Sequence, residues 1–165
     1  MSRNKRGNVW LGAAGLVVNS EGQWLVVRKT YGGLQGKWSI PAGFVDGNET
    51  ADDAAIREVK EETGIDSRLE GMIGFRTGVL NGEISDNMAI FLLRPTSEDQ
   101  LLIPQLREIS EAVWKSPLEL KQDKDSSLMI LEMAEKVIES GLDEIVDITP
   151  GDSFGYTSYK LFFKK

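Results

Sequence analysis

One segment of 23 residues, Gly43–Ile65, constrains this chain more than any other. It reads GFVDGNETADDAAIREVKEETGI, and its second half predicts a helix over residues 50–63 that stops at a glycine. Three glutamates, Glu58, Glu61 and Glu62, fall within five positions of this helix. Any fold that this chain adopts must therefore accommodate three neighbouring carboxylates.

These carboxylates share one face of the predicted helix. At about 100° per residue, Glu61 and Glu62 lie about 60° and 40° to either side of Glu58. Ile56 and Val59 point elsewhere, toward an expected core. Like charges at this spacing destabilise one another unless they are protonated or neutralised. A bound divalent cation would neutralise them.

The composition limits which cation this can be. The chain of 165 residues contains neither cysteine nor histidine, which excludes disulfides, thiolate nucleophiles and imidazole ligands. The remaining ligands are oxygen atoms, which suit Mg²⁺ or Mn²⁺. Because Mg²⁺ usually completes its coordination with substrate phosphates, the pattern predicts a phosphate-bearing substrate. The alternative is a solvated helix face with surface pairs to Arg57 and Lys60.

The longer pattern favours the metal site. The segment fits G-x(5)-E-x(7)-R-E-U-x-E-E-x-G-U, where U is a bulky aliphatic residue, at all nine fixed positions: Gly43, Glu49, Arg57, Glu58, Val59, Glu61, Glu62, Gly64 and Ile65. This pattern resembles the signature of the Nudix hydrolases. The flanking stretches GKWSIPAG and EISEAVWKSPLEL are also similar to Nudix chains, so the resemblance extends over about residues 9–141.

The resemblance implies an α/β fold, a Nudix-type α/β/α sandwich around a mixed β-sheet. It also implies hydrolysis, dependent on Mg²⁺ with Mn²⁺ as a substitute, of a nucleoside diphosphate linked to another group. Water would attack phosphorus directly, and no covalent nucleophile is needed, which agrees with the absence of cysteine and histidine.

The resemblance also assigns roles by position. Glu58 and Glu62 would be the main metal ligands, and Glu61 would be a further ligand or the general base. The backbone carbonyl of Ala42, just before the first glycine of the motif, would offer another metal ligand.

Other residues would support these ligands or bind substrate. Arg57 would orient the first glutamate, and Glu49 would support that network. Arg28 ends a predicted strand that leads into the site and is a candidate phosphate contact, as is Lys37. Phe44 could stack on a base. Four additional candidates are two aromatic residues for stacking and two carboxylates outside the motif: Tyr31, Phe75, Glu83 and Glu111.

The motif alone identifies neither the substrate nor whether the chain hydrolyses it. The marks typical of ADP-ribose, dinucleoside-polyphosphate, NADH and coenzyme A enzymes are absent near the motif. A MutT-like hydrolase of nucleoside triphosphates stays an alternative, because that group has no dependable short mark. One alternative is a Nudix-scaffold module that binds or senses a nucleotide without turnover. Another is an RNA 5′-end pyrophosphohydrolase, which the net charge of -7 disfavours because it does not attract nucleic acid. Isopentenyl-diphosphate isomerase chemistry requires a cysteine, which this chain lacks.

The rest of the chain predicts a strand-rich domain. We expect a β-hairpin at residues 10–30, an extended segment at 38–45, and two strands within 67–95 that are separated by a loop at 79–86. A further strand at 108–115, a helix at 126–141 and a C-terminal strand at 153–165 should follow. The C-terminal strand would cover a sheet edge or pair with a second subunit.

These elements suggest one domain. We expect a flexible N-terminus at residues 1–8, a Nudix domain at 9–141, and an extension at 142–165 that packs on the same domain or on a partner in a homodimer. No apolar run is long enough to span a membrane, and no secretory signal follows the basic start, so a cytoplasmic location is expected.

Overall fold

The computed structural model describes residues 7–165, except for the side chain of Phe154. The expected flexible N-terminus lies mostly outside these residues. Along the described chain the elements are β1 (Val9–Val17), β2 (Trp24–Lys29), β3 (Trp38–Ser39), β4 (Ala42–Phe44), α1 (Ala51–Thr63), β5 (Ser67–Leu80), β6 (Ile84–Pro95), β7 (Ile109–Lys115), α2 (Pro117–Gln122), α3 (Leu128–Ala134), β8 (Asp143–Ile145), the 3₁₀ helix η1 (Asp152–Phe154) and β9 (Leu161–Phe163).

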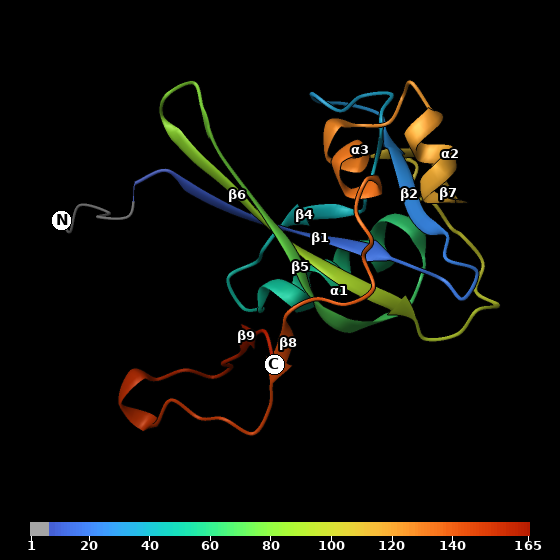
Figure 1. Ribbon diagram of the computed structural model, residues 1–165. Helices are drawn as coiled ribbons and strands as arrows, with labels where there is room; N and C mark the ends of the chain where they lie inside the picture. The colour runs from blue at the N-terminus through green and yellow to red at the C-terminus, as the bar shows by residue number, and fades with distance from the viewer. Residues whose placement is uncertain (1–6) are drawn as a thin grey trace.

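The strands form two main sheets (Figure 1). The larger sheet has the order β4-β1-β6-β5, in which β1 runs parallel to β6 and antiparallel to β4. The smaller sheet has the order β3-β2-β7, and β8 pairs with β9 separately. The expected α/β architecture with mixed strand directions is therefore confirmed.

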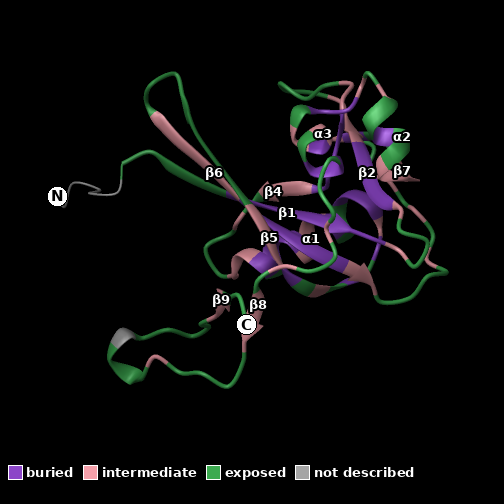
Figure 2. Ribbon diagram, in the orientation of Figure 1, coloured by how far each residue is buried: buried purple, intermediate pink, exposed green. Residues whose placement is uncertain are grey.

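Two apolar clusters lie on opposite faces of β1. Ala13 and Val17 join the cluster that contains Val59 of α1, whereas Ala14 and Leu16 join the cluster near α2 and α3. This alternation is the normal consequence of a strand with a helix layer on each side. Figure 2 shows the buried residues concentrated in these central strands, while the far end of the β5–β6 hairpin and the start of β1 are exposed.

Helix α1 confirms the predicted helix over 50–63. Thr50 occupies the N-cap position in an extended conformation, and Gly64 ends the helix in the left-handed conformation with φ 80°. The helix packs closely on β1, because a Cβ atom at Gly15 would come within 2.7 Å of Val59 Cγ2. This contact fixes the height of the helix above the sheet and so positions its glutamates.

Two predicted connections are wrong. β1 and β2 do not form a hairpin: they belong to different sheets and share only the isolated bridge Val18–Trp24, since the edges of β1 are occupied by β4 and β6. The predicted loop at 79–86 is mostly strand. β5 and β6 continue to a tight turn in which Asn81 and Gly82 adopt positive φ angles of 51° and 68°.

The C-terminal third also departs from expectation. The helix predicted over 126–141 ends at Ala134, and Val137 beyond it is 86% exposed because no neighbouring element covers it. The short helix α2 was not predicted, although its capping box is visible in the sequence. The strand predicted over 153–165 is limited to 161–163.

The C-terminal extension contacts the body of the same chain. The ring of Phe162 in β9 lies 5.5 Å from the ring of Phe91 in the core. Lys160 Nζ lies 2.7 Å from the Oδ2 atom of Asp52 in the first turn of α1. The domain limits at 9–141 and 142–165 stay predictions. Among the described residues, no helix is long and apolar enough to cross a membrane.

Candidate active site

The glutamates of α1 lie in different environments. Glu58 and Glu62, one helical turn apart, have side chains that are 13% and 2% exposed. The Glu61 side chain is 54% exposed. Helix periodicity therefore gives two shielded carboxylates and one that reaches solvent.

Arg57 links these glutamates to the loop before the helix. Its guanidinium donates to both Glu49 oxygens, with the shorter contact 2.6 Å, and its Nη1 donates to Glu58 Oε1 at 2.9 Å and Glu61 Oε2 at 3.1 Å. Its Nη2 also donates to the carbonyl of Phe44 at 3.1 Å. The Arg57 hydrogen bond lowers the pKa of Glu49, which therefore stays ionised and holds the guanidinium in place.

Glu62 is the most unusual carboxylate. Its Oε2 atom is buried without a hydrogen-bond partner, and Oε1 lies 3.4 Å from Lys29 Nζ. Burial raises the pKa of Glu62 to about 7, and the charge of Glu58 adds to this shift. The charge of Lys29 and a backbone hydrogen bond from Ala42 oppose it. A carboxyl group in this setting favours a proton or a metal cation over an empty ionised state.

Burial also raises the pKa of Glu58, although the hydrogen bond and charge of Arg57 oppose the shift. Both shielded glutamates are thus poised to gain a positive partner.

The donor set fits a hard divalent cation. Glu62 Oε2 is an unpartnered carboxylate oxygen, and Glu58 lies one turn away. The chain contains no cysteine or histidine, so neither a thiolate nor an imidazole can act as a ligand. Within residues 7–165 no three acidic side chains are grouped closely enough to form a ready-made metal site, because Glu61 is directed to Arg57. Glu61 would have to turn away from Arg57 to act as a third ligand.

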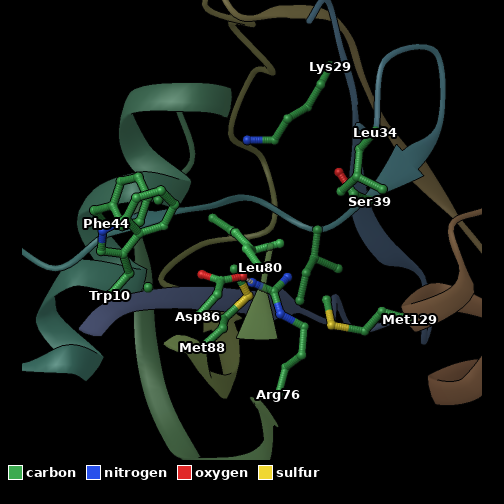
Figure 3. A pocket seen from close by; sticks show the side chains of 14 residues that line it. Trp10, Lys29, Leu34, Ser39, Phe44, Arg76, Leu80, Asp86, Met88 and Met129 are labelled. Carbon is green, nitrogen blue, oxygen red and sulfur yellow. Dashed lines mark hydrogen bonds and ion pairs between the residues drawn. The ribbon is translucent and has the colours of Figure 1, made fainter. Parts of the chain in front are cut away.

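A cavity of about 260 Å³ is linked to the glutamates by two of its lining residues: Gly43 contacts Glu58, and Lys29 pairs with Glu62. Its walls come from β1, the β2–β4 region, the β5–β6 hairpin and α3, and they are largely apolar. Figure 3 shows Trp10 and Phe44 together on one side, with ring centroids 5.6 Å apart in an edge-to-face contact. Arg76 and Asp86 form an ion pair of 3.0 Å on another wall, and the Lys29 side chain extends inward.

Two predicted substrate residues do not line this cavity. Arg28 instead bonds to Glu111 at 3.1 Å and Asp125 at 3.2 Å, and it stacks 4.1 Å from the Trp38 ring centroid. Lys37 Nζ donates to the carbonyl of residue 124. The phosphate contacts expected of Arg28 and Lys37 are therefore not supported by their positions.

Strand geometry explains why Arg28 lies away from the cavity. Successive side chains of β2 point to opposite faces, so Arg28 shares the face of Val26 in the cluster with Trp38. Lys29 points to the other face, where Leu25 meets the residues of α1. The residue of β2 that reaches the glutamates is thus Lys29, which sequence reasoning missed.

The remaining candidates divide in the same way. Ala42, Gly43 and Phe44, at the start of the motif, all line the cavity. Glu83 lies in the β5–β6 turn and does not line the cavity, and Glu111 is paired with Arg28 outside the cavity. The aromatic rings of Tyr31 and Phe75 are exposed and do not line the cavity, whereas the unpredicted Trp10 does.

Comparison with known proteins agrees with this geometry. The NUDIX domain family model matches residues 10–132. Nudix hydrolase 8 of Arabidopsis thaliana is 39% identical over 107 residues, which cover 63% of this chain and 28% of that protein. A putative 8-oxo-dGTP diphosphatase of Bacillus subtilis is 41% identical over 63 residues, which cover 38% of this chain and 40% of that protein.

The fold is similar to solved structures as well. The MutT protein from Methanosarcina mazei superimposes with a TM-score of 0.64 at 22% identity, over 78% of this chain and 94% of that one. The chain spans about a third of the length of the Arabidopsis relatives that it matches. Since the family model covers most of the chain and spans the complete motif, the chain belongs to the Nudix hydrolase family.

Proposed function

We propose that this chain hydrolyses a phosphoric anhydride bond of a nucleoside diphosphate derivative by attack of water on phosphorus. The observation that carries this proposal is the buried Glu62 carboxylate with its unpartnered Oε2, one turn from Glu58 and paired with Lys29, which lines the cavity. Burial of such a group destabilises the fold unless a ligand compensates for it. A metal–diphosphate complex would provide that compensation.

Mg²⁺ is the proposed cofactor, with Mn²⁺ as a substitute. The carboxylates of Glu58 and Glu62 and the carbonyl of Ala42 would hold it. When bound, the ion supplies neutralisation of phosphate charge and a lower pKa for a coordinated water. All of these ligand atoms are oxygens, which Mg²⁺ prefers, and the chain has no cysteine or histidine to compete with them.

The protein's own residues would then perform orientation and proton transfer. Glu49 fixes Arg57 through both of its oxygens, and Arg57 holds Glu58 in one orientation at 2.9 Å. Glu61 is the solvent-reaching carboxylate of the three. We assign to its carboxylate oxygens the removal of a proton from the attacking water, because a general base must meet water directly.

The cavity supports a nucleoside as the group attached to the diphosphate. Trp10 and Phe44 offer exposed aromatic surface on which a base can stack, and the paired charges of Arg76 and Asp86 can form hydrogen bonds to its edge. The B. subtilis relative, a putative 8-oxo-dGTP diphosphatase, is also named for a nucleotide.

A substrate panel tests this proposal. Nucleoside triphosphates, nucleoside diphosphate sugars, dinucleoside polyphosphates and an RNA with a 5′-triphosphate would each be incubated with the chain and Mg²⁺, and products separated by chromatography. We expect turnover of at least one nucleotide derivative, its loss with EDTA, and its recovery with Mg²⁺ or Mn²⁺. Binding without turnover across the panel would instead favour a sensing module, and metal-independent turnover would contradict the mechanism.

A further inference from the structure

Lys29 connects the glutamates with the cavity. Its Nζ lies 3.4 Å from Glu62 Oε1, and its side chain, 18% exposed, also lines the cavity together with Gly43 and Phe44. Figure 3 shows the amine end of Lys29 extending from its strand toward the side of the cavity where Phe44 lies. The ammonium group therefore sits between the proposed metal ligands and the space for a substrate.

The contact between Lys29 and Glu62 is loose compared with the other buried ion pairs. It is a single contact of 3.4 Å, whereas Arg57 makes several bonds down to 2.6 Å and Lys160 approaches Asp52 to 2.7 Å. Glu62 is the one ion-pair partner of Lys29 in the described part of the chain. A lysine side chain has a flexible stem, so its charge can move to a new partner at small cost.

We propose that Lys29 is an exchangeable counterion: its ammonium neutralises Glu62 while that carboxylate holds no metal, and it moves to a phosphate oxygen of the substrate when Glu62 becomes a ligand. The inference rests on the proposed function, since it requires a metal and a diphosphate at this site. It adds a specific residue, outside the Nudix motif, that binds the diphosphate.

The exchange predicts two effects of opposite sign. Without the Lys29 charge, the glutamates present a more negative site, so a free divalent cation should bind more tightly. The same change removes a charged contact from the bound diphosphate, so the nucleotide should bind more weakly. A lysine that served only to pack the strand would not produce this opposition.

The experiment compares Lys29→Met with the wild-type chain. Mn²⁺ binding is measured alone by electron paramagnetic resonance, and binding of α,β-methylene-ADP, whose bridging carbon resists hydrolysis, is measured by calorimetry with saturating Mg²⁺. We expect about fivefold tighter Mn²⁺ binding and about tenfold weaker nucleotide binding, each roughly the effect of one charge–charge contact near a protein surface.

Two further variants control the result. Lys121→Met removes a charge from the surface pair with Glu135, outside the cavity, and should change neither affinity. Lys29→Arg keeps the charge and should retain nucleotide binding within about threefold. Lys29→Gln also removes the charge, so it should show the same two opposite effects and tests the exchange if the methionine variant does not fold.

The outcomes distinguish this inference from the proposed function. If Lys29→Met lowers both affinities, or changes neither, the exchange is wrong while the proposed function stands. If the wild-type chain binds neither Mn²⁺ nor the analogue, the proposed function fails and the exchange fails with it.

Discussion

Gly43 lies directly against the carboxylate of Glu58. A Cβ atom built on Gly43 would overlap the Cδ and Oε1 atoms of Glu58, so no side chain larger than hydrogen fits there while Glu58 keeps its position. The backbone of Gly43 has no positive φ angle, and the need for glycine is therefore one of space. The first glycine of the motif thus creates room for its first α1 glutamate.

Gly43→Ala should therefore impair activity without unfolding the protein. The added methyl group displaces the Glu58 carboxylate, and a shift of about 1 Å in a catalytic group can lower the rate about a hundredfold. We expect kcat/KM to fall by about that factor, while thermal unfolding changes little because alanine suits the backbone. Gly47→Ala is the matched control, since a Cβ atom there meets nothing within 4 Å. Equal activity of the two variants would contradict the assigned role of this glycine.

Substitution of the glutamates should separate metal binding from proton transfer. Glu58→Gln and Glu62→Gln remove proposed ligands, so both Mn²⁺ binding and turnover should be lost, by about a thousandfold in kcat. Glu61→Gln removes the proposed base, so kcat should fall by about 10²- to 10⁴-fold while Mn²⁺ binding persists.

The measurements for these variants are Mn²⁺ binding by electron paramagnetic resonance and initial rates on the best nucleotide of the panel. If Glu61→Gln lost metal affinity as completely as Glu62→Gln does, the assignment of Glu61 as the base would be wrong. Near-normal turnover of Glu58→Gln would reject its role as ligand.

Helix α1 and its glutamates could be predicted because their information is local. The motif spans consecutive residues, and Gly64 ends the helix in the left-handed conformation that glycine favours. The partners of β1 are not local. Trp10 pairs with Asp86 of β6, a contact that the apolar run at 10–19 does not encode. The predicted hairpin failed for this reason.

The placement of Arg28 away from the cavity has a similar origin. The sequence indicates a basic strand end near the site, and period-two alternation places Arg28 and Lys29 on opposite faces of that strand. The sequence does not reveal which of these faces is covered by α1. That choice depends on packing between Leu25 and the residues of α1. The apolar pattern that includes Val137 predicted a longer helix. The fold provides no surface that buries this side chain, so the pattern was misleading there.

The stability of the metal-free protein should depend on pH through Glu62. Its folded pKa of about 7 lies above the ordinary value of 4.5, so the folded state binds more protons than the unfolded state between these values. The unfolding free energy should therefore fall as pH rises from about 4.5 to about 7, by up to about 3 kcal/mol.

Urea unfolding in EDTA across this range measures the effect. Glu62→Gln should remove most of the slope, and the remainder would come from Glu58, whose pKa is also raised. Saturating Mg²⁺ should likewise flatten the profile by stabilising the ionised form. A wild-type profile that rises with pH over this window would contradict the assignment.

An ion pair between Lys160 and Asp52 joins the C-terminal extension to α1. Asp52 is buried in the first turn of the helix, its Oδ1 has no hydrogen-bond partner, and Oδ2 lies 2.7 Å from Lys160 Nζ. Lys160→Met leaves this carboxylate buried and unpaired, which should cost about 3 kcal/mol of unfolding free energy. Asp52→Asn combined with Lys160→Met should recover part of that loss, because the amide is neutral. Asp53→Asn, which removes only the exposed 3.4 Å partner of Lys160, should cost less than about 0.5 kcal/mol. Urea unfolding of the wild-type chain and these three variants measures the contribution of the pair, and a Lys160→Met protein as stable as wild type would show that the extension does not hold α1 through this pair.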